Sequence, residues 1–226
     1  MATTAGERQI GKKLGHIKQN HVERYRFAIR MLKKHLPEGG FVLDAASGVG
    51  YGSKMIAEHG FAVIAVDRAA EAEEYQKYFE HPGVRFIREE IDLIKRHPEC
   101  GSFGAIVSLE TIEHVAGAAW ELTMRETTDL VIGTVPNQDV IAFNKHKHPW
   151  HYRHYTKTEI SDLFRFWVMS DWHTQYDKTG HRSKMIPGDD GMTLGFVASR
   201  RPKDRIAKVA RSVAALVERR EAELSE

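Results

Sequence analysis

The sequence VLDAASGVGYG occupies residues 42–52. Its first residues are apolar and predict a short buried strand, and its three glycines, at positions 48, 50 and 52, predict a turn into a helix. Glycine permits positive φ and lets a ligand approach the backbone at the N-terminus of the following helix. A dinucleotide-binding motif would have a glycine where Ser53 stands, so the match to it is poor. Asp44 lies ahead of the turn, where its carboxylate would repel a pyrophosphate and suits a cationic ligand.

The residues around this turn alternate between short apolar runs and helical patterns. We expect strands at 41–44, 61–66, 84–88, 105–108 and 130–135, with helices at 53–59, 71–79 and 120–127. Such alternation predicts an α/β fold with a parallel sheet covered by helices on both faces. A capping box at Thr156 begins a further helix at 156–164. Two final strands, at 166–172 and 192–199, are joined by a polar stretch at 177–191 that we expect to be a surface loop.

The two ends of the chain carry amphipathic patterns. Residues 7–36 predict one or two helices, and residues 201–226 predict a helix that either packs on its own domain or mediates self-association. With 226 residues and no linker-like segment, we expect a single domain over 1–226. It would consist of an N-terminal helical extension at 1–36, a core at 37–200 and a C-terminal helix at 201–226. A homo-oligomer formed through the terminal helices is one possible assembly.

Charge and cysteine content limit the classes of function. The chain has 33 Lys and Arg against 31 Asp and Glu, a net charge of +2, which indicates a balanced surface rather than one built for a polyanion. The single cysteine, Cys100, excludes an intrachain disulfide and a cysteine-based zinc site. No stretch approaches the roughly 20 apolar residues that span a bilayer, and the N-terminus lacks the apolar segment of a signal peptide. We therefore expect a cytoplasmic protein without a membrane partner.

The second predicted strand ends in an acidic residue, Asp67. A carboxylate at this position can accept hydrogen bonds from both ribose hydroxyls of an adenosine. It does so whether the adenosine belongs to a dinucleotide or to S-adenosylmethionine, so Asp67 alone does not separate the two. Taken with the glycine turn, it favours ligand binding over a simple strand-end cap.

Four motifs in a fixed order resemble those of class I S-adenosylmethionine-dependent methyltransferases. They are VLDAASGVGYGS, AVIAVDR, SLETIEHV after the fourth strand and TVPN after the fifth, followed by NxxKHxWHYxxYT at 144–156. Specifically, the chain resembles the small methyltransferases associated with glycosyltransferases and polysaccharide modification. The resemblance implies a Rossmann-like, doubly wound, seven-stranded and mostly parallel sheet with helices on both faces and a terminal antiparallel hairpin. It implies S-adenosyl-L-methionine as cofactor and S-adenosyl-L-homocysteine as product.

Three departures from the family pattern stand out. Ala46 replaces a glycine, which a close turn tolerates if its φ is negative. His154 stands where an acidic residue is common, and residues 126–129 replace a Pro-Gly-Gly turn before the fifth strand.

The resemblance assigns cofactor contacts residue by residue. Asp44, Ala46, Ser47, Gly48 and Gly50 would surround the methionine moiety. Asp67 would hold the ribose with Arg68 beside it, and Glu90 and Ile91, or alternatively Asp92, would lie at the adenine edge. Ser108 and Leu109 would lead toward the sulfonium and the acceptor.

Catalytic candidates lie in two segments. Methyl transfer requires alignment of acceptor and cofactor and, for a hydroxyl acceptor, removal of its proton. Glu110, Glu113 and His114 follow the fourth strand, at the end of the sheet where open α/β folds bind ligands. For the Glu113–His114 pair two interpretations stay open, bracing of the loop and direct catalysis. His151 is the preferred base from the second segment.

That second segment, residues 144–155, holds four histidines with aromatic residues between them. Three interpretations stay open: a lid over the acceptor to which His151 and Tyr155 contribute, a metal site in which neutral imidazoles share an ion, and a structural loop. No carboxylate lies in the run, and we assign no metal ligand from the sequence. Trp150 and Tyr152 suit stacking on a sugar face, or else belong to the core.

Rival functions lack their own signatures. The Asp/Asn-Pro-Pro-aromatic run of nucleic-acid amino-methyltransferases is missing where residues 108–111 read SLET, and Cys100 is misplaced for a cytosine-C5 nucleophile. The basic N-terminal stretch that includes Arg24 would support nucleic-acid binding, but a solvated helix face explains it equally well. We therefore expect methyl transfer to a small-molecule or glycan-type acceptor, at oxygen rather than nitrogen. The alternatives are a nucleic-acid or nucleotide methyltransferase and a non-catalytic S-adenosylmethionine-binding module.

Overall fold

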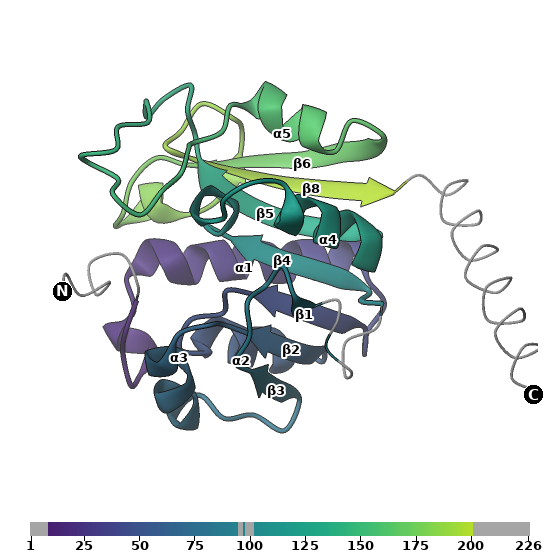
Figure 1. Cartoon of the computed structure of the whole chain (residues 1–226). Coiled ribbons are helices and arrows are strands. Elements are labelled where there is room, and N and C mark those ends of the chain that lie inside the picture. Colours follow the sequence, from purple (N-terminus) through teal and green to yellow (C-terminus); the bar gives the residue numbers. More distant parts are fainter. Residues whose placement is uncertain (1–8, 95–96, 98–101, 201–226) are drawn as a thin grey trace, which may run out of the picture.

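The computed structural model describes residues 9–94, 97 and 102–200. Within them, one eight-stranded sheet runs through the molecule in the order β3-β2-β1-β4-β5-β8-β6-β7 (Figure 1). The strands are β1 (Phe41–Ala45), β2 (Ala62–Val66), β3 (Val84–Ile87), β4 (Ala105–Leu109), β5 (Leu130–Pro136), β6 (Trp167–Gln175), β7 (Ile186–Pro187) and β8 (Thr193–Arg200).

The first five strands pair in parallel, and the last three pair antiparallel. Strand β1 lies between β2 and β4, with Val42 opposite both Val63 and Ala105. Strand β8 inserts between β5 and β6 and runs antiparallel to both. This arrangement confirms the expected Rossmann-like, doubly wound sheet with its terminal antiparallel hairpin. The chain order reverses between β1 and β4, which is where open α/β sheets bind ligands beyond the carboxyl ends of their strands.

Helices cover both faces of the sheet. The α-helices are α1 (Gln19–His35), α2 (Tyr51–Ala57), α3 (Ala70–Tyr75), α4 (Ala119–Thr127) and α5 (Lys157–Leu163). Short 3-10 helices are η2 (Leu14–His16), η3 (Gln76–Tyr78), η5 (Ile112–His114) and η6 (His181–Ser183). Helix α5 begins with the predicted capping box, in which the Thr156 hydroxyl accepts from the Glu159 amide and the Glu159 carboxylate accepts from the Thr156 amide.

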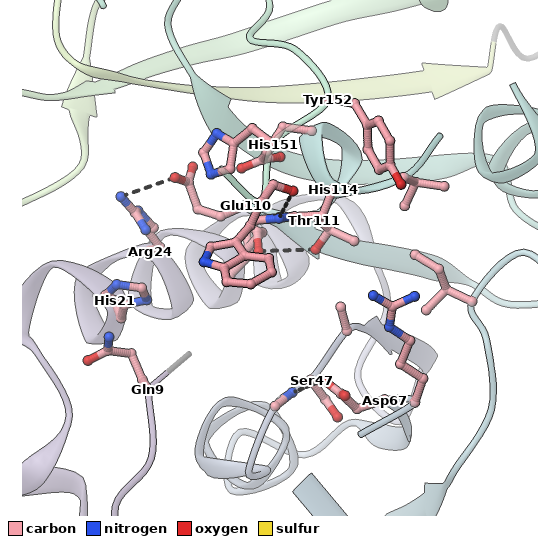
Figure 2. Close-up of a pocket in the computed structure, with 18 of the residues that line it drawn as sticks. Gln9, His21, Arg24, Ser47, Asp67, Glu110, Thr111, His114, His151 and Tyr152 are labelled. Atoms are coloured by element: carbon pink, nitrogen blue, oxygen red, sulfur yellow. Dashed lines mark hydrogen bonds and ion pairs between the residues drawn. The ribbon is translucent and has the colours of Figure 1, made fainter. Parts of the chain in front are cut away.

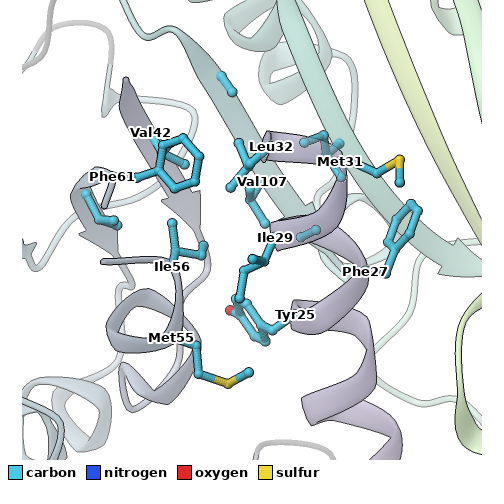
Figure 3. Packing of buried hydrophobic residues seen from close by; sticks show 14 of the residues in the cluster. Tyr25, Phe27, Ile29, Met31, Leu32, Val42, Met55, Ile56, Phe61 and Val107 are labelled. Carbon is cyan, nitrogen blue, oxygen red and sulfur yellow. The ribbon is translucent and has the colours of Figure 1, made fainter. Parts of the chain in front are cut away.

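Two separate cores hold the layers together. On one face, α1 and α2 pack against the sheet through Phe27, Leu32 and Ile56, which are fully buried beside Val42 and Val107 (Figure 3). On the other face, α4 and α5 bury the apolar side chains Trp120, Met124, Ile160 and Phe164. Each fully buried large apolar side chain contributes on the order of 1.5–3 kcal/mol. Because α1 forms part of the first core, its position relative to the strand ends is set by packing.

One segment differs from the sequence-based expectation, and another lies outside the described residues. The stretch 177–191, expected as a surface loop, contains η6 and the two-residue strand β7, which pairs with His173 and Thr174 and makes the sheet eight-stranded. The predicted C-terminal helix at 201–226 lies outside the described residues. Within those residues, no helix combines the length and the apolar character that a membrane crossing requires.

Candidate active site

The glycine turn joins β1 to α2 and uses three left-handed residues. Gly48 and Gly50 have φ of 56° and 89°, as glycine allows. Ala46 also has a positive φ of 56°, so the condition under which this turn would tolerate an alanine without strain, a negative φ, is not met. The left-handed conformation costs a non-glycine residue about 1–2 kcal/mol, and the surrounding turn imposes it. A side-chain carbon built on Gly48 would meet no atom within 4 Å, so the space over this residue is open.

Asp44 lies behind the turn, not on the surface that a ligand would touch. It is 1% exposed, and its carboxylate accepts hydrogen bonds from the Tyr25 hydroxyl at 3.1 Å and the Ser53 hydroxyl at 2.6 Å. Burial raises the pKa of Asp44 to about 7, although the two hydroxyl donors favour its charged form. The carboxylate therefore ties α1 and α2 to the end of β1.

Two other residues predicted to contact the cofactor occupy similar supporting positions. Gly50 lies so close to Gln76 that an added side-chain carbon would come within 2.2 Å of the Gln76 Oε1 atom. Ser108 is fully buried and accepts a hydrogen bond from the Trp120 indole at 3.4 Å. Neither residue lines the cleft described below. The eight remaining predicted contact residues do line it: Ala46, Ser47, Gly48, Asp67, Arg68, Glu90, Ile91 and Leu109, and so does the alternative Asp92.

Asp67 connects the ends of β1 and β2. Its Oδ2 accepts from the Gly48 amide at 2.9 Å, and its Oδ1 accepts from the Ala69 amide at 2.9 Å. Asp67 also lines the cleft, and because a carboxylate oxygen accepts up to about two hydrogen bonds, it can bind hydroxyls that approach from there. Arg68 and Glu90 stand beside it and form an exposed ion pair at 3.5 Å.

A cleft of about 760 Å³ runs along the carboxyl ends of the parallel strands (Figure 2). One end contains the glycine turn, Asp67 and the segment 89–92, and the other contains residues 109–116 and 149–152. All four predicted catalytic residues, Glu110, Glu113, His114 and His151, line this second end. The fold thus brings the two predicted groups of residues into one continuous cavity.

Helix α1 forms a wall of the cleft that the sequence did not reveal. Arg24 is 7% exposed, and its guanidinium donates to the Gln175 Oε1 atom at 3.1 Å and to the Thr193 hydroxyl at 3.0 Å. The interpretation of Arg24 as part of a solvated basic face was therefore wrong. Asn20, His21 and Tyr25 also line the cleft from α1. The Arg24–Gln175 contact joins residues 151 positions apart, and a pattern within one helix carries no signal of it.

The same wall carries several cations. Burial, together with the positive charges of Arg24, Lys18 and Lys178, lowers the pKa of His21 to about 3. His21 is therefore a neutral hydrogen-bonding group at physiological pH. The cleft is also lined by the acidic residues Glu89, Glu90 and Asp92, so it is mixed in charge and not uniformly basic.

Glu110 follows β4 in a left-handed conformation, with φ of 49°. Its amide donates to the Thr134 carbonyl at 2.9 Å, and its Oε2 lies 3.4 Å from the Arg24 Nη2 atom (Figure 2). Its Oε1 is buried and has no hydrogen-bond partner among the described residues. Glu110 also lines the cleft, and a carboxylate in that position can accept a proton or a hydrogen bond from a ligand.

The histidine segment docks on η5 through two backbone contacts. The Tyr152 amide donates to the Glu113 carbonyl at 2.7 Å, and the His114 Nδ1 donates to the Trp150 carbonyl at 3.1 Å. The His114 and His151 rings meet edge to face, with centroids 4.5 Å apart. Glu113 is fully buried at this junction.

A chain of hydrogen bonds orients the His151 ring. The His154 Nδ1 lies 2.8 Å from the Ile141 carbonyl, which can only accept, so this nitrogen carries a proton. The Nε2 of a neutral His154 is then an acceptor, and it lies 2.9 Å from the His151 Nδ1. His151 donates there and keeps a lone pair on its Nε2. Burial, with His114, His154, His148 and Lys145 nearby, lowers the pKa of His151 to about 3.

The aromatic residues of this segment divide into two groups. Trp150 and Tyr152 are 38% and 59% exposed and line the cleft, so they do not belong to the core. Tyr155 is 4% exposed and packs in the core beneath α5, away from the cleft lining. Of the four histidines, His146 is exposed, and the other three form one group of stacked and tilted rings.

The cofactor end of the cleft fits S-adenosylmethionine. The Ser47 hydroxyl is buried without a hydrogen-bond partner among the residues described, beside the open space over Gly48. An amino acid moiety offers groups that such a hydroxyl can bind, and the adjacent Asp67 carboxylate can hold ribose hydroxyls. The carboxylates of Asp67 and Glu90 also favour a cationic ligand over a pyrophosphate.

Comparisons with known proteins agree with this assignment. A family model described as "Methyltransferase domain" matches residues 42–131. No curated protein matches the chain in sequence.

Solved structures share the fold at low sequence identity. The methyltransferase domain of bacterial CtHen1-C has a TM-score of 0.59 and 15% identity, covering 80% of this chain and 99% of that one. The N-methyltransferase NodS from Bradyrhizobium japonicum WM9, solved with S-adenosyl-L-homocysteine, has a TM-score of 0.61 and 12% identity, covering 81% and 88%. The magnesium protoporphyrin IX methyltransferase from Synechocystis PCC 6803, solved with bound S-adenosylmethionine, has a TM-score of 0.59 and 14% identity, covering 80% of each chain.

The matched family model covers the glycine turn, Asp67 and the end of β4, which are the elements that build the cofactor end of the cleft. The strand order and the cleft at the carboxyl ends of β1, β2 and β4 agree with it. On these grounds residues 42–131 are similar to a methyltransferase domain, and the chain has the fold of the class I S-adenosylmethionine-dependent methyltransferases.

Proposed function

We propose that the chain transfers a methyl group to a hydroxyl oxygen of a small-molecule or glycan-type acceptor. One observation carries the proposal: the cofactor end of the cleft continues without interruption into the end formed by Glu110, Glu113, His114 and His151. A methyl donor at the first end and an acceptor at the second would meet near Leu109, where β4 ends.

Bound S-adenosylmethionine supplies an electrophilic methyl carbon on a positively charged sulfur. Asp67, Ser47 and Gly48 would hold the cofactor, with Arg68 and residues 90–92 around the adenosine. The walls from α1 and from residues 149–152 would exclude water and align the acceptor, which is the main contribution an enzyme makes to this reaction.

The preference for oxygen rests on groups that accept a proton. A hydroxyl must lose its proton as it is methylated, whereas a neutral amine already carries a nucleophilic lone pair. In the proposed reaction the acceptor oxygen bonds to the methyl carbon, the carbon–sulfur bond breaks with its electron pair on sulfur, and the hydroxyl proton passes to Glu110. The position of Glu110 in the cleft lining and the orientation of its carboxylate by Arg24 support this role.

Residues at the rim of the cleft support the proposed acceptor class. The exposed rings of Trp150 and Tyr152 offer flat apolar faces, and Lys145 lies 5.4 Å above the Tyr152 ring. Such rings beside polar groups suit a sugar or another ring-shaped acceptor. A nucleic acid would favour a continuous basic surface, and the carboxylates along this cleft interrupt one. A role in modifying saccharides is therefore part of the proposal.

The test uses cofactor labelled with ¹³C at the methyl carbon and a panel of mono- and oligosaccharides, phenols, amines and RNA and DNA oligonucleotides. We expect a labelled product from hydroxylated ring acceptors, with a methyl carbon shift typical of an ether. The variant Glu110→Gln should lower kcat by about 10²-fold or more and change the affinity for S-adenosylhomocysteine little. Trp150→Ala should raise KM for the acceptor. Methylation only at nitrogen, or only of oligonucleotides, would refute the proposed acceptor.

A further inference from the structure

We propose that Glu113, His114 and His151 bind a divalent first-row transition metal ion at the acceptor end of the cleft. Glu113 and His114 belong to η5, directly after β4, and His151 comes from the histidine segment. Each offers one ligand atom, and the three atoms lie within 4.8 Å of one another. The inference deepens the proposed function, because it concerns how the same end of the cleft would hold a hydroxylated acceptor.

The hydrogen bonds of the two imidazoles leave the correct nitrogens for a metal. His114 uses its Nδ1 proton on the Trp150 carbonyl, and His151 uses its Nδ1 proton on His154, which itself donates to the Ile141 carbonyl. In both rings Nε2 is therefore the unprotonated nitrogen, the one that can bind an ion. Metal-binding histidines nearly always donate their other ring nitrogen to a carbonyl, carboxylate or water in this way, which fixes the tautomer and the ring direction.

The carboxylate supplies what the histidine run lacks. Glu113 is fully buried, and an ionised carboxylate in such a position is costly unless a positive charge compensates it. A divalent ion between Glu113 and two neutral imidazoles provides that charge. The chain fold brings the carboxylate to the histidine segment through the Tyr152–Glu113 backbone hydrogen bond of 2.7 Å.

The ligand types indicate the kind of ion. Two imidazoles and one carboxylate suit Mn²⁺, Fe²⁺, Co²⁺ or Zn²⁺, whereas Mg²⁺ and Ca²⁺ prefer sites made of oxygen alone. Metal–nitrogen distances of about 2.1 Å let one ion span at most ~4.2 Å between two ligands, so the side chains would close slightly on binding. Three protein ligands leave coordination positions open, and His114 and His151 both line the cleft. Those positions would face the acceptor and could take its hydroxyl oxygens.

The experiment titrates chelator-treated full-length protein with Co²⁺ and records the visible absorption of the bound ion, with calorimetric titration of Zn²⁺ and Mn²⁺ in parallel. We expect one ion per chain. Glu113→Gln and His151→Gln should each weaken binding by at least about 100-fold, and His154→Phe, which removes only the partner of the His151 Nδ1, by roughly 10–100-fold. His146→Gln is the matched control, because His146 lies in the same segment but is exposed and outside the cluster.

A parallel titration of every variant with S-adenosylhomocysteine separates the two claims. If Glu113→Gln and His151→Gln bind S-adenosylhomocysteine as tightly as wild type does, these variants are folded. A loss of Co²⁺ binding in them then supports the metal site. If wild-type protein binds no ion with a Kd below about 1 mM, or binds one equally well after Glu113→Gln and His151→Gln, the metal proposal is wrong while cofactor binding stands. If the homocysteine compound does not bind even to wild-type protein, the proposed function fails independently.

Discussion

The buried carboxylate of Asp44 should make the stability of the fold depend on pH. Its pKa is raised to about 7 in the folded chain, from 3.8 for an exposed aspartate, because burial at the end of β1 disfavours the charged form more than the two hydroxyl donors favour it. A raised carboxyl pKa means that folding favours the protonated form. Above pH 4 the unfolded chain is ionised at this residue, so the folded state becomes less stable as pH rises, until the folded-state pKa is passed.

The size of the effect follows from the shift. A difference of about three pKa units corresponds to roughly 4 kcal/mol when fully developed, at about 1.4 kcal/mol per unit. About 2.5 kcal/mol of this would develop between pH 5 and pH 8, because part of the loss has already occurred at pH 5. Asp44→Asn removes the titration and keeps a side chain of the same shape, with an amide oxygen that can accept from Tyr25.

The assay is urea unfolding of wild-type protein and Asp44→Asn at pH 5 and pH 8, followed by tryptophan fluorescence. The free energy of unfolding of the variant minus that of wild type should be about 2.5 kcal/mol larger at pH 8 than at pH 5, because only wild type loses stability over this range. Asp162→Asn, at an exposed position on α5, is the control and should show no such change. Equal differences at both pH values for Asp44→Asn would refute the reasoning.

Two further substitutions test the backbone of the turn and its contact with α1. Ala46→Gly should stabilise the protein by roughly 0.5–1 kcal/mol, because the strain of a φ of 56° that it relieves is larger than the conformational entropy that a glycine loses on folding. Calorimetry should show Tm raised by about 2–4 °C. An unchanged or lower Tm would contradict the claim that Ala46 is strained. Gly52→Ala should lower the free energy of unfolding, measured with urea, by about 1–3 kcal/mol, because the added carbon would lie 2.0 Å from the Tyr25 ring. If the variant were as stable as wild type, the close packing of Tyr25 of α1 on Gly52 would be wrong.

The parts of the fold that local patterns encode were predictable from the sequence. The glycine turn, the acidic residue at the end of β2 and the capping box at Thr156 each involve residues within a few positions of one another, and all three lie where expected. The alternation of strands and helices predicted the sheet. Strand β7 was missed because two residues carry no periodicity.

The functional site was predictable only in part, because its walls come from distant segments. In the sequence Arg24 does not differ from the other basic residues of its helix. In the structure it forms a hydrogen bond with Gln175 and an ion pair with Glu110, both distant in sequence. The histidine run contains no carboxylate of its own. The fold places Glu113, which lies 38 residues upstream of His151, close to it. Asp44 was placed correctly at the strand end, but the direction of its side chain depends on Tyr25 and Ser53, which a strand pattern does not specify.

Calorimetric titration with S-adenosylmethionine and S-adenosylhomocysteine tests most directly the central claim, that the cleft binds S-adenosylmethionine. The proteins are wild type, Asp67→Ala, Asp67→Asn and the control Glu74→Ala at an exposed position, and NADH is the rival ligand. Asp67 would accept from two ribose hydroxyls, and hydrogen bonds to a charged group contribute about 1.5–3 kcal/mol each. We predict that both sulfur compounds bind wild-type protein and Glu74→Ala alike, that Asp67→Ala binds them at least about 30-fold more weakly, and that Asp67→Asn lies between. Binding of NADH in their place, or equal affinity in Asp67→Ala, would contradict the account of the cleft as a methyltransferase site.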